Sequence, residues 1–403
     1  MMESENKMIF KFEERALKWL ADNIIYVAVA AAFLLSVLIR ISLRNFYSFD
    51  ADSCLIPWYD AMKANGGIRG LAVPIEGCNY NFPYMLLVAI MTYLPVPALF
   101  AYKMFSCLFD YIMAVGVAMI VRELATERKD ELSAFAFIAV IMAPTVFLDS
   151  AAWAQCDSIY SSFIVWAIYF LIKNKNIWAF VFYGLAFAFK FHFIFALPFL
   201  VFYYFYKRRF TILHFLLIPV PMIVLSLPAL VQGRTISEMI SIYTDNTSLH
   251  QSISNGYPTF WRILNDGSYI DSYDTLKTAA IVFTVVALGC LVTYLVRRQI
   301  VLDGANIVYI AFIFTYTTVL FLPAMHERYG FVYEILALAI ACLVPRTIPL
   351  AAGLIGLSMY TYGAYLYNQS FNETIPAIVN VIIYIAYLYI LFRRIFIDRI
   401  QKK

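Results

Sequence analysis

The stretch IIYVAVAAAFLLSVLI, residues 24–39, decides the fold class of this chain. It is almost continuously apolar, which makes it long for a signal-peptide core and suited to a membrane crossing of roughly 20 residues. The basic residues of the preceding stretch are Lys7, Lys11, Arg15 and Lys18. We therefore expect a retained first span over 24–43, preceded by a cytoplasmic amphipathic segment.

Apolar runs of this kind recur to the end of the chain. Of the 403 residues, 63% are hydrophobic and 14% are charged, and the mean hydropathy is +0.76. Soluble domains are only about half apolar. The net charge of +4 is small, and short basic runs between apolar segments fit the positive-inside rule better than a nucleic-acid partner. The chain is therefore expected to be a multi-pass protein of the cell membrane.

The apolar runs predict an all-α, polytopic transmembrane helical bundle that forms a single domain over residues 1–403. About twelve spans are expected, at 24–43, 98–121, 133–148, 158–172, 176–189, 191–206, 212–231, 278–296, 305–322, 331–345, 348–366 and 376–392. Residues 83–94 are apolar but too few to cross, so they predict an interfacial or re-entrant helix. The long external loops are then about 44–97 and 232–277.

The distribution of basic residues predicts which side is which. If 83–94 does not cross, 20 of the 30 Lys and Arg residues fall in the segments on one side. Counting 83–94 as a span would invert every later loop. The positive-inside rule therefore places both termini in the cytoplasm.

Six short polar clusters then share the external face. They are Asp50 with Asp52, Asn79-Tyr80-Asn81, Trp153 to Asp157, Lys190-Phe191-His192, Asn255 to Trp261, and His326-Glu327-Arg328-Tyr329. Polar groups are costly in a bilayer and often mark function where they persist. Their common side predicts an active site on the extracytoplasmic face.

The first two clusters belong to the first external loop. Asp50 can act as a general base on an acceptor hydroxyl, and Asp50 or Asp52 can bind a divalent cation; the alternative is a solvated loop. Asn79 and Tyr80 can hydrogen-bond a sugar, although a turn that starts a helix at Pro83 is the preferred interpretation. Each pattern is weak alone.

The third and fifth clusters also have structural alternatives. Trp153 and Gln155 can contact a substrate, and Trp153 can instead anchor the chain at the interface. Asp157 can bind substrate or cap the following helix. The stretch Asn255 to Trp261 is typical of a turn.

The remaining clusters carry cations. Lys190 and His192 can contact an external phosphate, or Lys190 can snorkel to the interface. Arg328 can bind a phosphate, with Glu327 holding it in place and His326 moving a proton; an ordinary polar loop with an internal salt bridge is the alternative.

In order and placement, these motifs resemble the GT-C superfamily of integral-membrane glycosyltransferases, in particular bacterial mannosyltransferase-like members that use polyprenyl-phosphate sugars. The matching residues are Asp50, Pro57-Trp58-Tyr59-Asp60, Gly66-Gly67, Asn79 to Tyr84, Trp153 to Tyr160, Lys190 to His192 and Met325 to Tyr329. The chain departs at Phe49 and Ala154, where relatives often have Gly, and at Phe82, where a second Pro is common. These departures concern the acceptor pocket more than the reaction.

The resemblance implies inverting transfer of a hexose from a laterally entering polyprenyl-phosphate donor to an extracytoplasmic glycan or lipid-linked acceptor. Asp50 would be the general base. The leaving phosphate needs stabilisation, for which the candidates are Arg328, Lys190, His192 and Arg262. The nameable ligand set for a metal is thin, so no cofactor is expected to be obligatory, although a divalent cation could bind.

Two other classes are compatible with the pattern. A polytopic transporter or lipid flippase also has cations near the membrane, but such carriers often show internal repeats and broken helices at the bilayer centre, and neither is evident in the sequence. A polysaccharide polymerase or ligase would share the lipid substrates and differ by joining preassembled chains.

Overall fold

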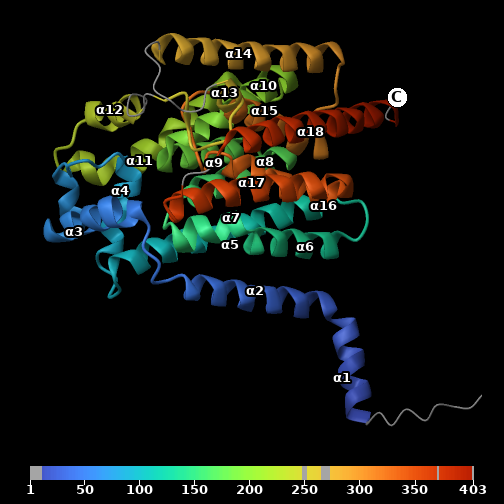
Figure 1. Ribbon diagram of the computed structural model, residues 1–403, viewed down its shortest axis with the longest axis horizontal. Coiled ribbons are helices and arrows are strands. Elements are labelled where there is room, and N and C mark those ends of the chain that lie inside the picture. The colour runs from blue at the N-terminus through green and yellow to red at the C-terminus, as the bar shows by residue number, and fades with distance from the viewer. Residues whose placement is uncertain (1–10, 247–251, 265–272, 370–371, 402–403) are drawn as a thin grey trace, which may run out of the picture.

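The computed structural model describes residues 11–246, 252–264, 273–369 and 372–401, and these residues are almost entirely helical. Figure 1 shows most of the long helices running side by side across the molecule. The short helices α3 (Ile56–Ala64), α4 (Phe82–Met91) and α12 (Ile236–Asn246) gather at the left end. The end of α18 and the helix α1 (Lys11–Asp22) lie toward the opposite end. The expected all-α bundle is confirmed.

Each predicted span overlaps a helix, although 133–148 is interrupted at Ala143 and 191–206 begins as a 3-10 turn. The long helices are α2 (Ile24–Ser42), α5 (Ala98–Leu124), α6 (Lys129–Met142), α8 (Asp157–Ile172), α9 (Asn176–Phe189), α10 (Leu197–Lys207), α11 (Pro219–Val231), α14 (Tyr273–Arg297), α15 (Ala305–Phe321), α16 (Phe331–Leu343), α17 (Ile348–Leu366) and α18 (Thr374–Gln401). The shorter elements include α7 (Pro144–Phe147) and α13 (Trp261–Leu264). Two π-helical turns, η1 (Ala51–Leu55) and η3 (Leu148–Ala152), and four 3-10 turns, η2 (Gly67–Ala72), η4 (Phe191–Phe195), η5 (Ile212–Leu217) and η6 (Pro345–Thr347), complete the set.

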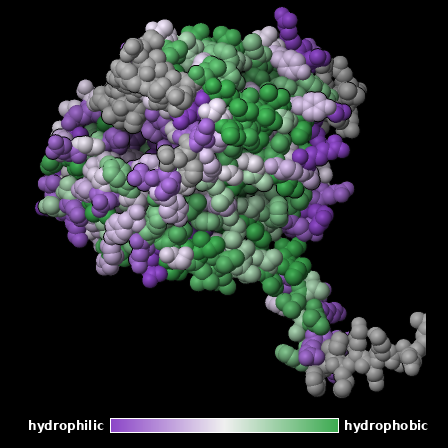
Figure 2. All heavy atoms as spheres, in the orientation of Figure 1, coloured by the Kyte–Doolittle hydropathy of each residue, from purple (hydrophilic) through white to green (hydrophobic). Residues whose placement is uncertain are grey.

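The chain is a multi-pass membrane protein by the length and composition of its helices. In its described part, five helical segments can cross a membrane alone: α2, α5, Ile212–Val231, α14 and Thr374–Phe396. A sixth crossing would combine α6 with Pro144–Ala152, which bend by 46° at their junction. Figure 2 shows hydrophobic residues through the middle of the visible face and along α2, with hydrophilic residues at the left and right margins. The predicted total of twelve spans stays a prediction.

The helix α4 starts where the sequence predicts. The Asn81 side chain caps it by accepting a hydrogen bond from the Tyr84 backbone N–H at 3.3 Å, and Pro83 occupies its first turn. Ten residues of helix extend only about 15 Å, half the thickness of a bilayer core. This length agrees with the prediction that the segment does not cross.

One buried carboxylate, Asp110, joins four elements of the bundle. Arg40 of α2 donates from Nε and Nη2 to Asp110 Oδ2 of α5, at 3.0 and 2.8 Å. Ser150 donates to the same oxygen at 2.6 Å, and Ser158 donates to Oδ1. Ser150 belongs to the turn η3 (Leu148–Ala152), and Ser158 to the start of α8. Asp110 therefore fixes both elements that flank Trp153 and Gln155.

Two very short strands connect the distant loops. The strand β1 (Ser254–Asn255) pairs in parallel with β2 (Met325–His326). The turn predicted for Asn255 is therefore only partly right: Asn255 pairs with His326, and the chain bends after it at Gly256, where φ is +80°. The pairing depends on a contact with a loop far along the chain, which local turn chemistry does not reveal.

The Asp110 junction makes a stability prediction. Asp110→Ala leaves the Arg40 guanidinium buried without its counter-charge, and removing one partner of a buried pair typically costs about 3–5 kcal/mol. We expect a large fall in the thermal unfolding midpoint of the detergent-purified protein. As a control, Glu123→Ala removes the exposed pair with Lys173 and should leave the midpoint almost unchanged. Equal effects of the two variants would contradict the assignment.

Candidate active site

Two wide helical turns meet at the candidate site. The π-helical turn η1 (Ala51–Leu55) follows Asp50, and the π-helical turn η3 ends beside Trp153. The hydroxyl of Ser48 joins them by donating to the Trp153 carbonyl at 3.0 Å and accepting from the Ala51 N–H at 3.2 Å. Such turns recur at functional sites because they aim side chains differently from a regular helix. Here they aim Trp153 at Asp50.

Asp50 is held by three side-chain donors. Its Oδ2 accepts from Trp153 Nε1 at 2.9 Å and from Gln155 Nε2 at 2.7 Å. Its Oδ1 accepts from the hydroxyl of Tyr365, at the end of α17. The side chain of Asp50 is nevertheless 25% exposed. The carboxylate is therefore fixed in orientation and still open to a ligand.

A buried group of charges, formed by Asp157, Lys190 and Arg328, lies next to Asp50. Lys190 Nζ donates to both oxygens of Asp157, at 2.8 and 2.9 Å, and Arg328 Nε donates to Oδ2 at 3.0 Å. Asp157 is fully buried and Lys190 nearly so. Buried charges persist when they are paired and hydrogen-bonded in this way. Asp157 therefore serves as the counter-ion of two cations.

This geometry decides two alternatives that the sequence leaves open. Cys156, not Asp157, occupies the N-cap position of α8, and no side chain caps the helix there. Asp157 lies in the first turn of α8, where an acid favours the helix dipole, but it is not a hydrogen-bonding cap because its two oxygens are engaged by Lys190 and Arg328. Lys190 also does not snorkel, since its ammonium is directed inward to Asp157. The phosphate contact predicted for Lys190 gains no support from this placement.

Arg328 stands between the two carboxylates. Its Nη1 is 3.8 Å from Asp50 Oδ2, while its guanidinium carbon lies 4.8 Å from the centroid of the Trp153 ring system. Burial alone would lower the pKa of Arg328, but nearby Asp157, Tyr80 and Asp50 raise it well above its ordinary value. Asp157 occupies Nε, and the terminal Nη groups make no hydrogen bond to a described residue, so they can still donate to an anion.

Tyr80 supports the site from the first external loop. Its hydroxyl donates to Gln155 Oε1 at 3.3 Å, and its ring stacks on Tyr84 with centroids 4.2 Å apart. Burial raises the pKa of Tyr80 well above its ordinary value, so the hydroxyl stays protonated and keeps donating. Tyr80 thus orients the amide of Gln155 whose nitrogen holds Asp50.

The two histidines of the predicted clusters lie at the edge of the site. His192 packs against Tyr329 with ring centroids 4.0 Å apart, and its buried Nδ1 has no hydrogen-bond partner among the described residues. His326, on β2, has its Nδ1 3.6 Å from Glu327 Oε2. Within this loop Glu327 therefore contacts His326, while Arg328 pairs with Asp157 and Asp50.

Three predicted site residues lie elsewhere. Asp52 is exposed and makes no side-chain hydrogen bond or ion pair among the described residues. A helical turn directs residues two apart to different faces, so Asp52 cannot join Asp50. Asn79 is exposed in the loop before Tyr80. Arg262 pairs with Glu373 at 3.2 Å and so belongs to a separate group of charges.

The structure also adds residues that the sequence does not single out. Tyr365 sits inside an apolar run, where an aromatic residue carries no signal of its own. Asp149 is fully buried, neither carboxylate oxygen has a hydrogen-bond partner among the described residues, and it interacts electrostatically with Asp157, Arg328 and Lys190. An acid directly after the predicted span 133–148 is a signal that could have identified Asp149.

Ala154 adopts a backbone conformation that suits glycine. Its φ is +63°, and it is fully buried between Trp153 and Gln155. The left-handed region costs an L-residue roughly 1–2 kcal/mol. This is one of the positions where the resembling proteins often have Gly, so the departure leaves the turn in place at the expense of some strain.

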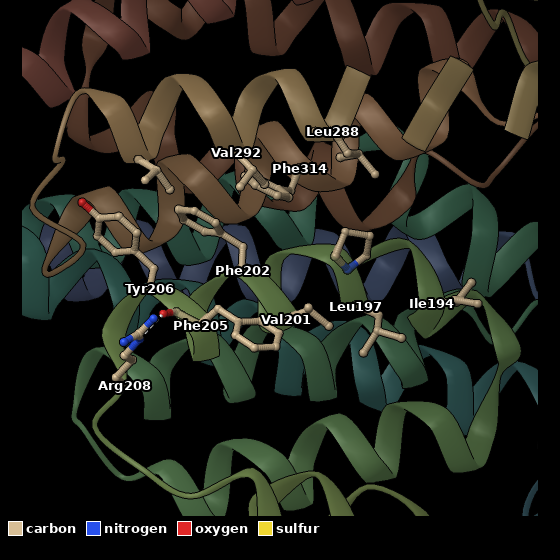
Figure 3. Close-up of a pocket in the computed structure, with 13 residues that line it drawn as sticks. Ile194, Leu197, Val201, Phe202, Phe205, Tyr206, Arg208, Leu288, Val292 and Phe314 are labelled. Atoms are coloured by element: carbon tan, nitrogen blue, oxygen red, sulfur yellow. Dashed lines mark hydrogen bonds between the residues drawn. The ribbon is translucent and has the colours of Figure 1, made fainter. Parts of the chain in front are cut away.

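A polar cavity and an apolar groove lie near the site. A polar cavity of about 540 Å³ is lined by Tyr365, Glu327 and Glu373, among others. An apolar groove of about 790 Å³ runs between α10, α14 and α15. Figure 3 shows Ile194 at one end of this groove and Arg208 at the other, with Phe202 and Val292 between them. Ile194 follows His192 by two residues, so that end of the groove lies close to the site.

The comparison with curated proteins finds no match. Residues 79–263 match the model of Glycosyltransferase family 87. The matched segment includes Tyr80, Trp153, Gln155, Asp157 and Lys190, which converge around Asp50 and Arg328. This match favours an enzyme over a transporter. Together with the apolar helices, it identifies the chain as a membrane glycosyltransferase similar to glycosyltransferase family 87.

Proposed function

We propose that the chain transfers a hexose from a polyprenyl-phosphate donor to a glycan or lipid-linked acceptor on the extracytoplasmic face, with inversion at the anomeric carbon. The observation that carries this proposal is the placement of Asp50. It is an accessible carboxylate, oriented by three donors and lying 3.8 Å from a cation. An acceptor base next to a site for a leaving anion is what glycosyl transfer from a phosphate requires.

The proposed reaction is a single displacement. Asp50 removes the proton of the acceptor hydroxyl as that oxygen bonds to the anomeric carbon. The bond from this carbon to the phosphate oxygen breaks, and the polyprenyl phosphate leaves with the electron pair. A retaining route would need a carboxylate as nucleophile, and Asp157 is unsuited to that role because it is fully buried and paired with two cations. Inversion is therefore the simpler outcome.

Arg328 is the proposed partner of the leaving phosphate. Its terminal Nη groups remain available while Nε holds Asp157, and a planar guanidinium suits phosphate oxygens. Lys190 contributes indirectly. It also pairs with Asp157, so the carboxylate of Asp157 neutralises less of the positive charge of Arg328. The cationic charge of Arg328 also supplies what a divalent cation would, so we propose that no metal is obligatory.

The apolar groove supports a lipid-linked donor. Its lining is almost wholly hydrocarbon, from residues such as Leu197, Val201 and Leu288, and it extends along α10 (Figure 3). An isoprenoid chain can lie in such a groove with its phosphate toward the His192 end, beside Tyr329 and Arg328. A nucleotide donor would leave the groove without a ligand. The charge bias of the loops supports an extracytoplasmic site.

The base assignment predicts the behaviour of Asp50→Asn. The amide cannot accept the acceptor proton, so transfer should fall on the order of 10²–10⁴-fold while donor binding is retained. The measurement is transfer of radiolabelled sugar from polyprenyl-phosphate mannose or glucose by the purified protein in liposomes. Asp52→Asn, an exposed acid two residues away, is the matched control and should retain wild-type activity. Undiminished transfer by Asp50→Asn would remove Asp50 from the mechanism.

The hydrogen bond from Trp153 to Asp50 makes a second prediction. Trp153→Phe keeps an aromatic ring beside Tyr365 but removes the indole N–H that donates to the carboxylate. A hydrogen bond to a charged group contributes about 1.5–3 kcal/mol, so we expect kcat to fall roughly 10–100-fold.

A matched tryptophan separates this effect from general destabilisation. Trp166→Phe also removes an indole donor, in this case to the Ile112 carbonyl, away from Asp50. It should change the thermal midpoint slightly and leave kcat per folded protein unchanged. If both variants lose the same activity per folded protein, the Trp153 bond has no specific role.

Metal dependence can be tested directly. Among the described residues, no group of three or more His, Cys, Asp or Glu side chains is arranged to hold an ion. With Arg328 as the phosphate partner, we expect transfer by protein treated with EDTA to equal that of untreated protein. A loss of activity that Mg²⁺ or Mn²⁺ restores would show that a cation shares the role given to Arg328.

A further inference from the structure

The polar cavity beside Asp50 is built from distant parts of the chain. Its walls include Glu327, before α16, together with Thr361 and Tyr365 of α17 and Gln369 and Glu373 between α17 and α18. Its volume of about 540 Å³ lies within the range of ordinary small-ligand sites. No motif in the sequence predicts that these residues line one cavity.

Two residues of the cavity lining, Tyr365 and Phe49, are direct neighbours of the proposed base. Tyr365 lines the cavity and donates its hydroxyl to Asp50 Oδ1, while Trp153 stacks on the Tyr365 ring with centroids 4.3 Å apart. Phe49, the neighbour of Asp50 in sequence, also contributes to the lining. A molecule in the cavity can therefore present a hydroxyl to Asp50 without crossing the buried charges behind it.

The charge of the cavity is opposite to that of the phosphate partner. Two carboxylates, Glu327 and Glu373, line it, and its lining residues in the described part of the chain include no lysine or arginine. Arg262 lies 3.2 Å from Glu373 and only partly offsets this negative charge. An anion placed here would face like charges, which disfavour binding.

We propose that the cavity is the acceptor subsite and that it selects an uncharged sugar. This inference rests on the proposed function. Sugar hydroxyls can donate to the carboxylates of Glu327 and Glu373 and accept from the amide of Gln369, while the apolar face of the ring packs on Tyr365. A phosphorylated sugar or a hexuronic acid lacks a cationic partner in this lining. Glu327 and Glu373 therefore determine specificity.

The test compares matched acceptors that differ at C6, where the neutral hydroxymethyl group of the hexoside is replaced by the carboxylate of the hexuronide. With a polyprenyl-phosphate mannose or glucose donor, donor turnover is measured with p-nitrophenyl hexosides and with the matching p-nitrophenyl hexuronides. We expect the neutral hexosides to raise turnover above hydrolysis by water, with kcat/KM at least about tenfold above that of the hexuronides.

Substitution of the acids should weaken this selection. Glu327→Gln and Glu373→Gln should raise the acceptor KM for hexosides and reduce the preference over hexuronides about tenfold when combined, with the donor KM unchanged. Glu76→Gln, an exposed acid of the first loop, makes the same change of charge away from the cavity and should alter none of these values. Gln369→Ala tests the cavity without changing its charge and should raise the acceptor KM alone.

The outcomes separate the two proposals. If wild-type protein consumes no polyprenyl-phosphate donor, the proposed function fails and the acceptor inference fails with it. If the donor is consumed but no hexoside raises turnover above hydrolysis, or hexuronides serve equally well, only the acceptor inference is overturned. It is likewise overturned if Glu327→Gln, Glu373→Gln and Gln369→Ala, each folded by thermal unfolding, all keep the wild-type acceptor KM.

Discussion

The carboxylate of Asp157 imposes the constraint on which the site depends. It is fully buried in an apolar bundle, where an unpaired charge is costly, and it is stabilised by Lys190 and Arg328. These three residues come from the start of α8, the end of α9 and the loop before α16. Satisfying one buried charge therefore brings three distant segments together. The position of Arg328 beside Asp50 is a consequence of that pairing.

A second buried carboxylate, Asp110, acts in the same way. Asp110 is paired with Arg40 and accepts hydrogen bonds from the hydroxyls of Ser150 and Ser158. Because Ser158 follows Asp157 directly, the two buried carboxylates together fix the start of α8. The connection between η3 and α8 is held at both ends, and it carries Trp153 and Gln155, two of the three side chains that orient the Asp50 carboxylate. Rigid support of this kind is what a base needs if it is to meet its substrate in one orientation.

Three regions near Asp50 differ in charge and polarity, and each is suited to a different part of the proposed substrates. The apolar groove along α10 is suited to a lipid chain, Arg328 to a phosphate, and the acidic cavity next to Tyr365 to an uncharged polyol. Asp50 lies where the last two meet. The proposed reaction needs these three environments, with the anomeric carbon between the leaving phosphate and the acceptor hydroxyl and the proposed base beside that hydroxyl.

The sequence by itself determined the class of the protein and its helical segments, because hydropathy and helix termini are local properties of the chain. The order of the apolar segments also predicted that the polar clusters lie near one another. It also singled out Asp50 and Arg328. Only the tertiary structure decided the partners: Arg328 reaches Asp157 across 171 residues, and Tyr365 reaches Asp50 across 315. It turned Lys190 inward, left Asp52 outside and assigned Arg262 to Glu373. Side-chain pairing depends on distances in space between buried charges, and no local pattern encodes those distances.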